Sequence, residues 1–221
     1  MISIWAKDAL THQGWQSHVT VTADEDGVIC SVESDTPPSG TITGLLLPAP
    51  ANLHSHAFQR AMTGMTEARG DDPKDNFWTW RKLMYRFLQH LTPDDIETIT
   101  AFVQMEMLEA GFGTSAEFHY IHHQPDGSLY DNPAELSERV LAAAAQSGIG
   151  LTHLPVMYEQ GGCDGRPLGA NQKRFGHTVD QYATLLDCIE SRLKDMPSDT
   201  VLGTAPHSLR AVSCETLEAI T

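Results

Sequence analysis

The strongest constraint on the fold is an alternation that begins near residue 45, where short apolar segments are followed by segments of helical periodicity. Strands alternating with helices predict βα units on a parallel sheet, because a parallel connection needs a crossover helix. No G-x-G-x-x-G motif follows a strand, which favours a barrel over a dinucleotide-binding fold. The predicted fold is therefore α/β, a partial (β/α)8 TIM-type barrel of about four βα units over residues 46–221.

Helix-capping residues set the expected limits of these elements. Thr92, followed by a proline and two aspartates, predicts a helix that Gly111 can end. Asn132, also followed by a proline, predicts a second helix that stops at Gly148, and Ser213 could cap a fourth. A long loop is expected between the first strand and residue 92. The expected strands are 45–54, 114–120, 150–156 and 200–205, and a third helix is expected over 179–195.

Residues 1–45 differ from the rest of the chain and predict a separate β-element. The segments 18–23 and 28–34 are rich in β-branched residues, and a turn-forming stretch separates them at 24–27. A loop rich in proline, serine and glycine follows at 35–40. We expect this element to form part of a composite β-sandwich whose other strands come from elsewhere.

Composition excludes several classes of partner. The chain has 29 acidic and 14 basic residues and a net charge of -15, which argues against binding to nucleic acid. No apolar stretch approaches the ~20 residues that span a bilayer, and the first residues do not resemble a signal peptide, so no membrane partner is expected. Four widely spaced cysteines indicate reduced thiols. A soluble, cytoplasmic enzyme is the expectation.

His54 and His56 lie two residues apart at the end of the first predicted barrel strand. Strand periodicity places both imidazoles on one face, about 6.6 Å apart along the backbone, so they can converge on one cation. Zinc accepts imidazole nitrogen and, in catalytic sites, keeps a position open for water. Two ordinary polar histidines in a loop are the alternative interpretation of this pattern.

Four longer segments make the chain resemble one family. An apolar strand ending in H-x-H after a short β-segment resembles the amidohydrolase superfamily. The four longer segments make the chain similar to the N-formimino-L-glutamate deiminase family. These segments are NLHSHAFQR (52–60), FWTWR (77–81), EFHY (117–120) and HSLR (207–210). The similarity covers the first half of that family's sequence.

The resemblance implies a zinc-dependent hydrolysis of N-formimino-L-glutamate to N-formyl-L-glutamate and ammonia, in histidine degradation. It implies a single zinc held by His54 and His56, with the further ligands and the catalytic acid or base expected beyond Thr221. The implied partners are a dicarboxylate substrate and, at full length, a second copy in a homodimer. The implied substrate-binding residues are Gln59, Arg81, Tyr120, His207 and Arg210; arginine's planar fork suits carboxylates, and tyrosine and glutamine offer hydrogen bonds.

Because two histidines leave a catalytic zinc short of its usual three protein ligands, we expect the 221-residue chain alone to be inactive or nearly so. We also expect it to be a fragment, or to depend on a complementary half, since a half-barrel leaves a strand edge unpaired. Two other functions stay open. One is a purine-type deaminase of the same superfamily, which would not need Arg81 and Arg210 for carboxylates. The other is a non-catalytic domain that binds a metal or a partner.

Weaker features receive structural interpretations. His122 and His123 are interpreted as part of a hydrophilic loop rather than as a second metal site, and His153 as a hydrogen-bonded core residue. The aromatic residues at 77–80 are interpreted as packing or as a lid, and Cys163 as part of a flexible, glycine-rich loop.

Overall fold

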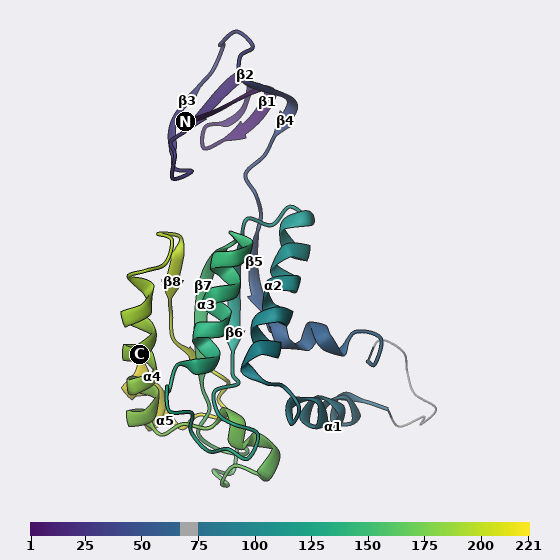
Figure 1. Ribbon diagram of the computed structural model, residues 1–221, viewed down its shortest axis with the longest axis vertical. Helices are drawn as coiled ribbons and strands as arrows, with labels where there is room; N and C mark the ends of the chain where they lie inside the picture. Colours follow the sequence, from purple (N-terminus) through teal and green to yellow (C-terminus); the bar gives the residue numbers. More distant parts are fainter. Residues whose placement is uncertain (67–74) are drawn as a thin grey trace. The chain divides into compact units, whose positions relative to one another are not determined.

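The computed structural model describes residues 1–66 and 75–221, and these divide into two compact units, Met1–Ala49 and Pro50–Thr221 (Figure 1). Each unit is described by itself. The predicted division lay after residue 45, four residues earlier than the division that the contacts define. None of the helices in the described ranges has the length and apolar character needed to cross a membrane.

The first unit is a four-stranded sheet of order β3-β2-β1-β4. Its strands are β1 (Ile2–Thr11), β2 (Gly14–Ala23), β3 (Ile29–Glu33) and β4 (Thr41–Leu46). β1 and β2 form an antiparallel hairpin, whereas β4 runs parallel to β1. The strands predicted at 18–23 and 28–34 are confirmed within β2 and β3. β1 was not predicted, because Lys7 and Asp8 interrupt the apolar alternation at its centre.

The limits predicted for the first barrel strand were wrong. Leu45 and Leu46 belong to β4 of the first unit, where they pair with β1. The barrel strand β5 begins only at Ala51 (Ala51–Ser55). Pro48 and Pro50 lie between the two strands, and proline cannot donate a hydrogen bond to a ladder. The chain therefore leaves one sheet and enters the next at these prolines.

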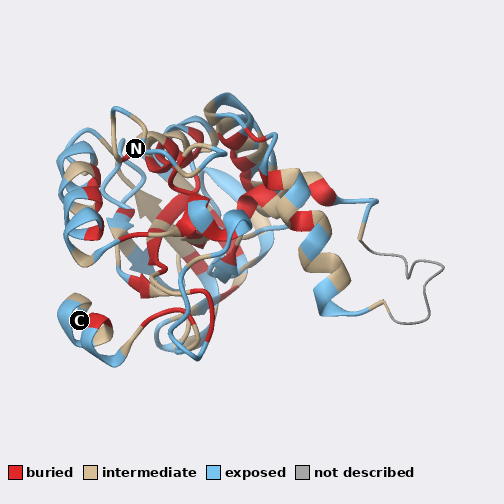
Figure 2. Ribbon diagram, turned by 90° about the horizontal axis from the view of Figure 1, so that it is seen from below, coloured by how far each residue is buried: buried red, intermediate tan, exposed pale blue. Residues whose placement is uncertain are grey.

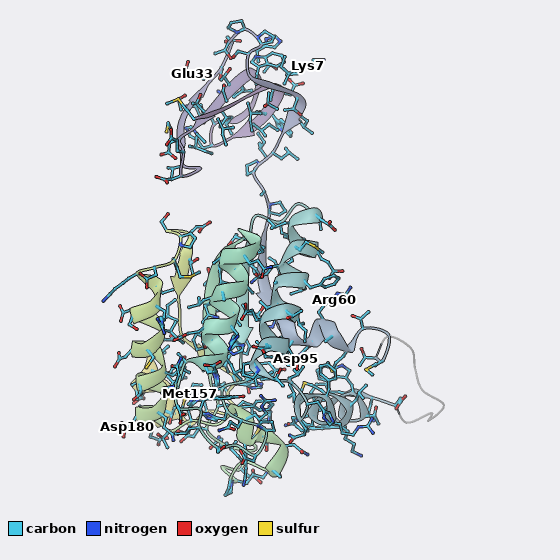
Figure 3. The ribbon with its side chains drawn as sticks, in the orientation of Figure 1. Lys7, Glu33, Arg60, Asp95, Met157 and Asp180 are labelled. Carbon is cyan, nitrogen blue, oxygen red and sulfur yellow. The ribbon has the colours of Figure 1, made fainter. Side chains whose placement is uncertain are left out.

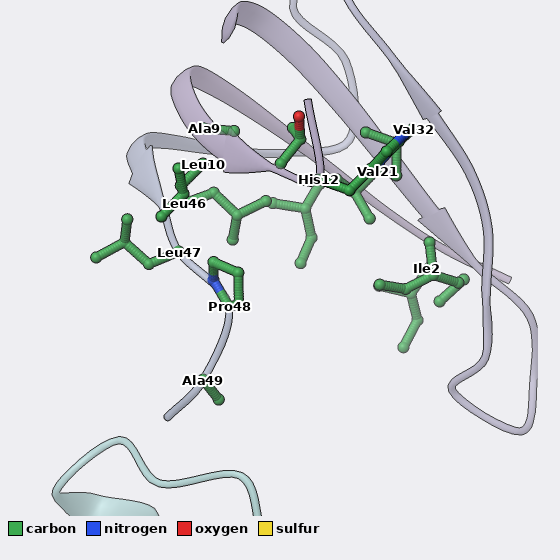
Figure 4. Close-up of a pocket in the computed structure, with 14 residues that line it drawn as sticks. Ile2, Ala9, Leu10, His12, Val21, Val32, Leu46, Leu47, Pro48 and Ala49 are labelled. Atoms are coloured by element: carbon green, nitrogen blue, oxygen red, sulfur yellow. The ribbon is translucent and has the colours of Figure 1, made fainter. Parts of the chain in front are cut away.

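The first unit leaves apolar surface uncovered. Its buried core consists of three small residues, Ala6, Ala9 and Val19. Beside them lies an open apolar cavity of about 460 Å³, where Ile2 and Ile29 remain 58% and 62% exposed (Figure 4). Such a face suits packing against another sheet. The composite β-sandwich stays a prediction.

The second unit confirms the predicted partial barrel. Its parallel strands are β5, β6 (Thr114–His119), β7 (Gly150–Met157) and β8 (Thr200–Leu202), in that order, and the short β9 (Ala205–Pro206) pairs with β7. The helices α2 (Pro93–Glu109), α3 (Glu135–Ser147) and α4 (Val179–Leu193) lie side by side along the sheet (Figure 1). The buried residues, red in Figure 2, lie on β6, on β7 and on one side of each of these helices.

Most predicted helix ends are confirmed. Thr92 caps α2 through a hydrogen bond from the Asp95 N–H, and Ser213 caps the last helix, α5 (Cys214–Ile220). Gly148 ends α3 with a φ of 77°, a conformation that glycine adopts without strain. The start of α3 was predicted two residues too early. Asn132 accepts a hydrogen bond from the Ala134 N–H instead, in a turn that precedes the helix.

The loop predicted after the first strand contains two helical segments. A 3-10 turn, η1 (Ala57–Met62), follows β5, and a regular helix, α1 (Phe77–Leu88), carries the aromatic residues. Asn76 caps α1 by accepting a hydrogen bond from the Trp78 N–H. The remaining part of the predicted loop, residues 67–74, lies outside the described residues. The aromatic residues are therefore on a helix, where Trp80 packs against the core and Phe77 and Trp78 stay exposed.

Two histidines are buried more deeply than predicted, and a third, buried as predicted, differs in its hydrogen bonding. His122 and His123 lie in a loop after β6, but this loop is buried, not hydrophilic, and His177 packs against both rings at centroid distances of 4.5 and 4.6 Å. His153 lies in the core of β7, and neither of its ring nitrogens has a hydrogen-bond partner in the described ranges. The prediction that His153 is hydrogen-bonded was therefore wrong. Tertiary contacts from distant segments enclose all these rings.

A buried arginine joins α1 to the rest of the second unit. Arg174, in the 3-10 segment η2 (Ala170–Phe175), is 1% exposed. Its guanidinium donates to the carbonyl oxygens of Leu88, Leu91 and His123. Leu88 is the last residue of α1, where helix carbonyls lack partners within the helix, and Leu91 lies three residues beyond it. Arg174 therefore holds the end of α1 against the buried loop after β6.

We expect Arg174→Met to lower the free energy of unfolding by about 3 kcal/mol, because three buried carbonyls lose their donor. Arg192→Met is the matched control: Arg192 is about half exposed and pairs with Glu138, so its loss should cost less than about 1 kcal/mol. Urea unfolding followed by circular dichroism measures both. Equal effects of the two substitutions would contradict this role for Arg174.

Candidate functional site

A cavity of about 390 Å³ opens at the carboxyl ends of the strands of the second unit. Met157, the last residue of β7, marks this end in Figure 3, where side chains from several loops crowd together. All seven residues that the sequence singled out lie in the wall of this one cavity: His54, His56, Gln59, Arg81, Tyr120, His207 and Arg210. They come from β5, η1, α1 and the segments that follow β6 and β9. Their individual roles stay predictions.

The two histidines converge as their spacing predicts. The Nε2 atoms of His54 and His56 are 3.1 Å apart, and the rings meet edge to face. Two imidazole nitrogens bound to one tetrahedral zinc would be about 3.3 Å apart at ordinary Zn–N distances. The separation of the two nitrogens therefore fits a shared cation.

The second nitrogen of His56 is also fixed. Its Nδ1 lies 2.9 Å from the Phe118 carbonyl oxygen, which can only accept, so Nδ1 carries the proton and Nε2 keeps its lone pair toward His54. Burial lowers the pKa of His56, against the opposing effect of this hydrogen bond, and favours the neutral ring. Metal-binding histidines commonly donate their other N–H in this way. Within residues 1–66 and 75–221, no group of three or more histidine, cysteine or acidic side chains is arranged to hold a metal.

Glu117 supports the histidine pair and was not singled out from the sequence. It is buried on β6, and its Oε1 accepts a hydrogen bond of 2.7 Å from the N–H of Ala57, the residue after His56. Burial raises the pKa of Glu117 to about 7, although hydrogen bonds from Ser55 and Ala57 oppose that shift. The sequence feature that could have identified Glu117 is that it is the one acidic residue in a strand without other charged side chains. Its partner on β5 could not be identified without the sheet register.

Two arginines face the cavity without a carboxylate partner among residues 1–66 and 75–221. The Arg81 guanidinium lies over the ring of Tyr85, 4.9 Å from its centroid, and near Trp78. Arg210 donates to the Tyr158 hydroxyl at 3.2 Å. Neither arginine forms an ion pair with a described residue. The cavity therefore combines two cations with the imidazole pair, and this combination suits an anionic ligand.

The remaining predicted residues supply neutral hydrogen-bonding groups. Gln59 donates through Nε2 to the Tyr120 hydroxyl at 3.0 Å, and that hydroxyl donates to the Met84 sulfur, a weak acceptor. Burial lowers the pKa of His207 to about 4, and the nearby charge of Arg210 makes a smaller contribution in the same direction. His207 is therefore neutral at pH 7. Its Nδ1 lies 3.0 Å from the Ser208 hydroxyl.

The fold and the cavity define a parallel βα-barrel protein whose ligand site lies at the strand carboxyl ends, where barrel enzymes bind their substrates. Residues 45–221 match the amidohydrolase family, and residues 1–41 match the N-terminal domain of formimidoylglutamate deiminase HutF. The chain belongs to the amidohydrolase family.

Individual relatives agree with this family. Formimidoylglutamate deiminase of Pseudomonas aeruginosa is 43% identical over all of this chain and 48% of its own length. An amidohydrolase from Brucella melitensis is 40% identical, with a TM-score of 0.94 over all of this chain and 49% of its own. A mutant of atrazine chlorohydrolase from Arthrobacter aurescens TC1, crystallised with zinc and atraton, is 20% identical and has a TM-score of 0.71. The match covers 100% of this chain and 49% of the chlorohydrolase. The chain spans about half the length of these relatives.

We expect the chain to bind Zn²⁺ through the histidine pair. His56→Ala should weaken binding by about a hundredfold or more, because even outer-shell partners of metal ligands are worth roughly 10–100-fold. His90→Ala is the matched control, since His90 is exposed and does not line the cavity. Competition with a chromogenic zinc chelator measures both. Equal affinity of the two variants would show that zinc binds elsewhere.

We expect Glu117 to make stability depend on pH. Its folded pKa of about 7 lies above the ordinary 4.5, so its stabilising contribution is present below pH 4.5 and is lost as the pH rises to 7. The loss amounts to roughly 3 kcal/mol. Glu117→Gln should lack this loss and gain stability relative to the wild type across the window. Urea unfolding from pH 4.5 to 8, with a chelator present, tests it; parallel profiles would contradict the assignment.

Proposed function

We propose that the complete protein hydrolyses N-formimino-L-glutamate to N-formyl-L-glutamate and ammonia, as a step of histidine degradation. The observation that carries this proposal is the cavity itself. Its wall contains a converging imidazole pair and two guanidinium groups that have no carboxylate partner among the described residues. The match to formimidoylglutamate deiminase of P. aeruginosa supports the same substrate.

The two arginines explain the preference for a dicarboxylate. Arg81 projects from α1 and Arg210 from the segment after β9, so the two cations reach the cavity from different elements. Each guanidinium can bind one carboxylate through two parallel hydrogen bonds. Their aromatic neighbours shield them from water and restrict their rotamers. Two separate anchor points would fix the substrate's direction in the cavity.

The polar groups near the histidines suit the formimino end of the substrate. The Tyr120 hydroxyl gives its proton to a thioether, and a better acceptor on the substrate can replace that contact. The Oε1 of Gln59 accepts no hydrogen bond from a described residue and can accept one from an amidine N–H. His207 is neutral at pH 7, so it can either donate or accept a hydrogen bond.

The residues present fit a single zinc, with His54 and His56 as two of its ligands. When bound, zinc lowers the pKa of water and makes a nucleophile available at neutral pH. The related atrazine chlorohydrolase was crystallised with zinc, which supports the choice of metal. Since a catalytic zinc usually takes three protein ligands, we also propose that residues 1–221 alone have little or no activity.

We expect the complete protein to release ammonia from N-formimino-L-glutamate and not from guanine. Arg81→Met and Arg210→Met should each raise KM by about tenfold to a hundredfold, because each removes a charged hydrogen-bonding partner. Arg192→Met, far from the cavity, is the control that should leave KM unchanged. Coupled ammonia detection measures all of them.

Three results would count against the proposal. Efficient turnover of guanine would favour the purine-type deaminase. Zinc uptake without ammonia release would favour a non-catalytic protein. Enzyme-level turnover by residues 1–221 alone would overturn the proposal of their inactivity.

A further inference from the structure

Tyr158 lies in the wall of the same cavity, although it belongs to none of the motifs that the sequence singled out. It follows directly after β7, at the carboxyl end of that strand, and is 2% exposed. Its ring packs between His207 and Phe175, at centroid distances of 4.5 and 5.6 Å. These contacts hold the phenol rigidly, so the direction of its oxygen is set by the fold.

Two donors converge on the Tyr158 oxygen. Arg210 donates through Nη1 at 3.2 Å, and a guanidinium has no acceptor. Gln172 donates through Nε2 at 2.9 Å. The amide of Gln172 cannot be reversed without loss, because its Oε1 accepts the Gly169 N–H at 2.9 Å. The phenol oxygen therefore accepts twice, which uses the two acceptor positions of a hydroxyl.

The hydroxyl proton of Tyr158 is left for a third partner. Among the contacts of the described residues, no acceptor for it occurs. The neighbouring Tyr120 differs, since it accepts from Gln59 and gives its proton to Met84. A donor of this kind, rigid and buried beside a guanidinium, is suited to an anionic oxygen.

We propose that Tyr158 donates its hydroxyl proton to the same carboxylate that Arg210 binds, so that the two groups form one carboxylate subsite. Gln172 is a positioning residue, since it saturates the phenol oxygen and turns the proton toward the ligand. The inference deepens the proposed function and rests on it for the dicarboxylate nature of the substrate. It names a specificity-determining group that does not take part in the chemistry of the C–N bond.

The test is equilibrium binding of N-formyl-L-glutamate to the complete protein, measured by calorimetry. Tyr158→Phe keeps the ring packing and removes only the hydroxyl, and it should weaken binding by about tenfold or more, the value of one hydrogen bond to a charged group. Tyr182→Phe is the matched control. Tyr182 is also buried, but its hydroxyl donates to the Pro155 carbonyl and does not line the cavity. Its loss should lower stability and leave the Kd unchanged.

Two ligands that lack one carboxylate sharpen the test. N-formyl-L-norvaline lacks the distal carboxylate, and N-formyl-γ-aminobutyrate lacks the α-carboxylate. The Tyr158→Phe effect should disappear for one of them and persist for the other, which also identifies the carboxylate bound. An unchanged Kd for N-formyl-L-glutamate, or an equal loss for all three ligands, would overturn the subsite.

The proposed function is tested separately, by measuring the release of ammonia from N-formimino-L-glutamate by the wild type. A wild type that binds the dicarboxylate with the expected Tyr158 effect, but releases no ammonia, would refute the function and keep the subsite. Ammonia release by the wild type, together with an unchanged Kd of the Tyr158→Phe variant for N-formyl-L-glutamate, would refute the subsite and keep the function. Failure of the wild type to bind N-formyl-L-glutamate would refute both.

Discussion

The parallel pairing of β5 with β6 is the constraint on which the cavity depends. This register sets Ser55 opposite Glu117, and an irregularity between Asn52 and Ser55, the stretch that contains His54, places one extra residue on β5. Bulges of this kind redirect side chains and are common beside functional sites. The pairing also brings the Phe118 carbonyl to Nδ1 of His56 and the Glu117 carboxyl to the next N–H. One backbone ladder thus orients both the ring of His56, a predicted metal ligand, and the turn that follows it.

Buried polar groups extend this orientation to the rest of the cavity wall. Arg174 donates to the carbonyl of Leu88, the last residue of the helix that carries Arg81, and to the Leu91 carbonyl just beyond it. Gln172, from the same short segment, holds Tyr158, and Tyr158 holds Arg210. An unpaired polar group inside a protein costs roughly 1–3 kcal/mol, so such contacts strongly favour one arrangement. The segment η2 therefore links both arginines of the cavity to the core of the second unit.

The electrostatics of the cavity run against those of the whole chain. A net charge of -15 should repel anions at long range, yet Arg81 and Arg210 line the cavity without a carboxylate neighbour in the described ranges. Charges separated by more than about 8–10 Å of solvent are largely screened at physiological salt. Under the proposed function, local guanidinium groups outweigh the net charge in attracting an anionic ligand to the cavity. Net charge informs on solubility and on nucleic-acid binding, and says little about a site of this size.

The sequence by itself determined the βα alternation, most helix ends and the convergence of His54 with His56, because these features depend on periodicity and on contacts a few residues apart. It did not determine where β4 gives way to β5, since leucines suit either sheet, or that α1 is a helix. Only the tertiary structure decided the burial of His122 and His123, the contact between Glu117 and Ala57, and the triad of Gln172, Tyr158 and Arg210. These contacts join residues up to 60 positions apart in the chain. No local pattern encodes such pairs, because they arise from strand register and from how loops pack across the ends of the sheet.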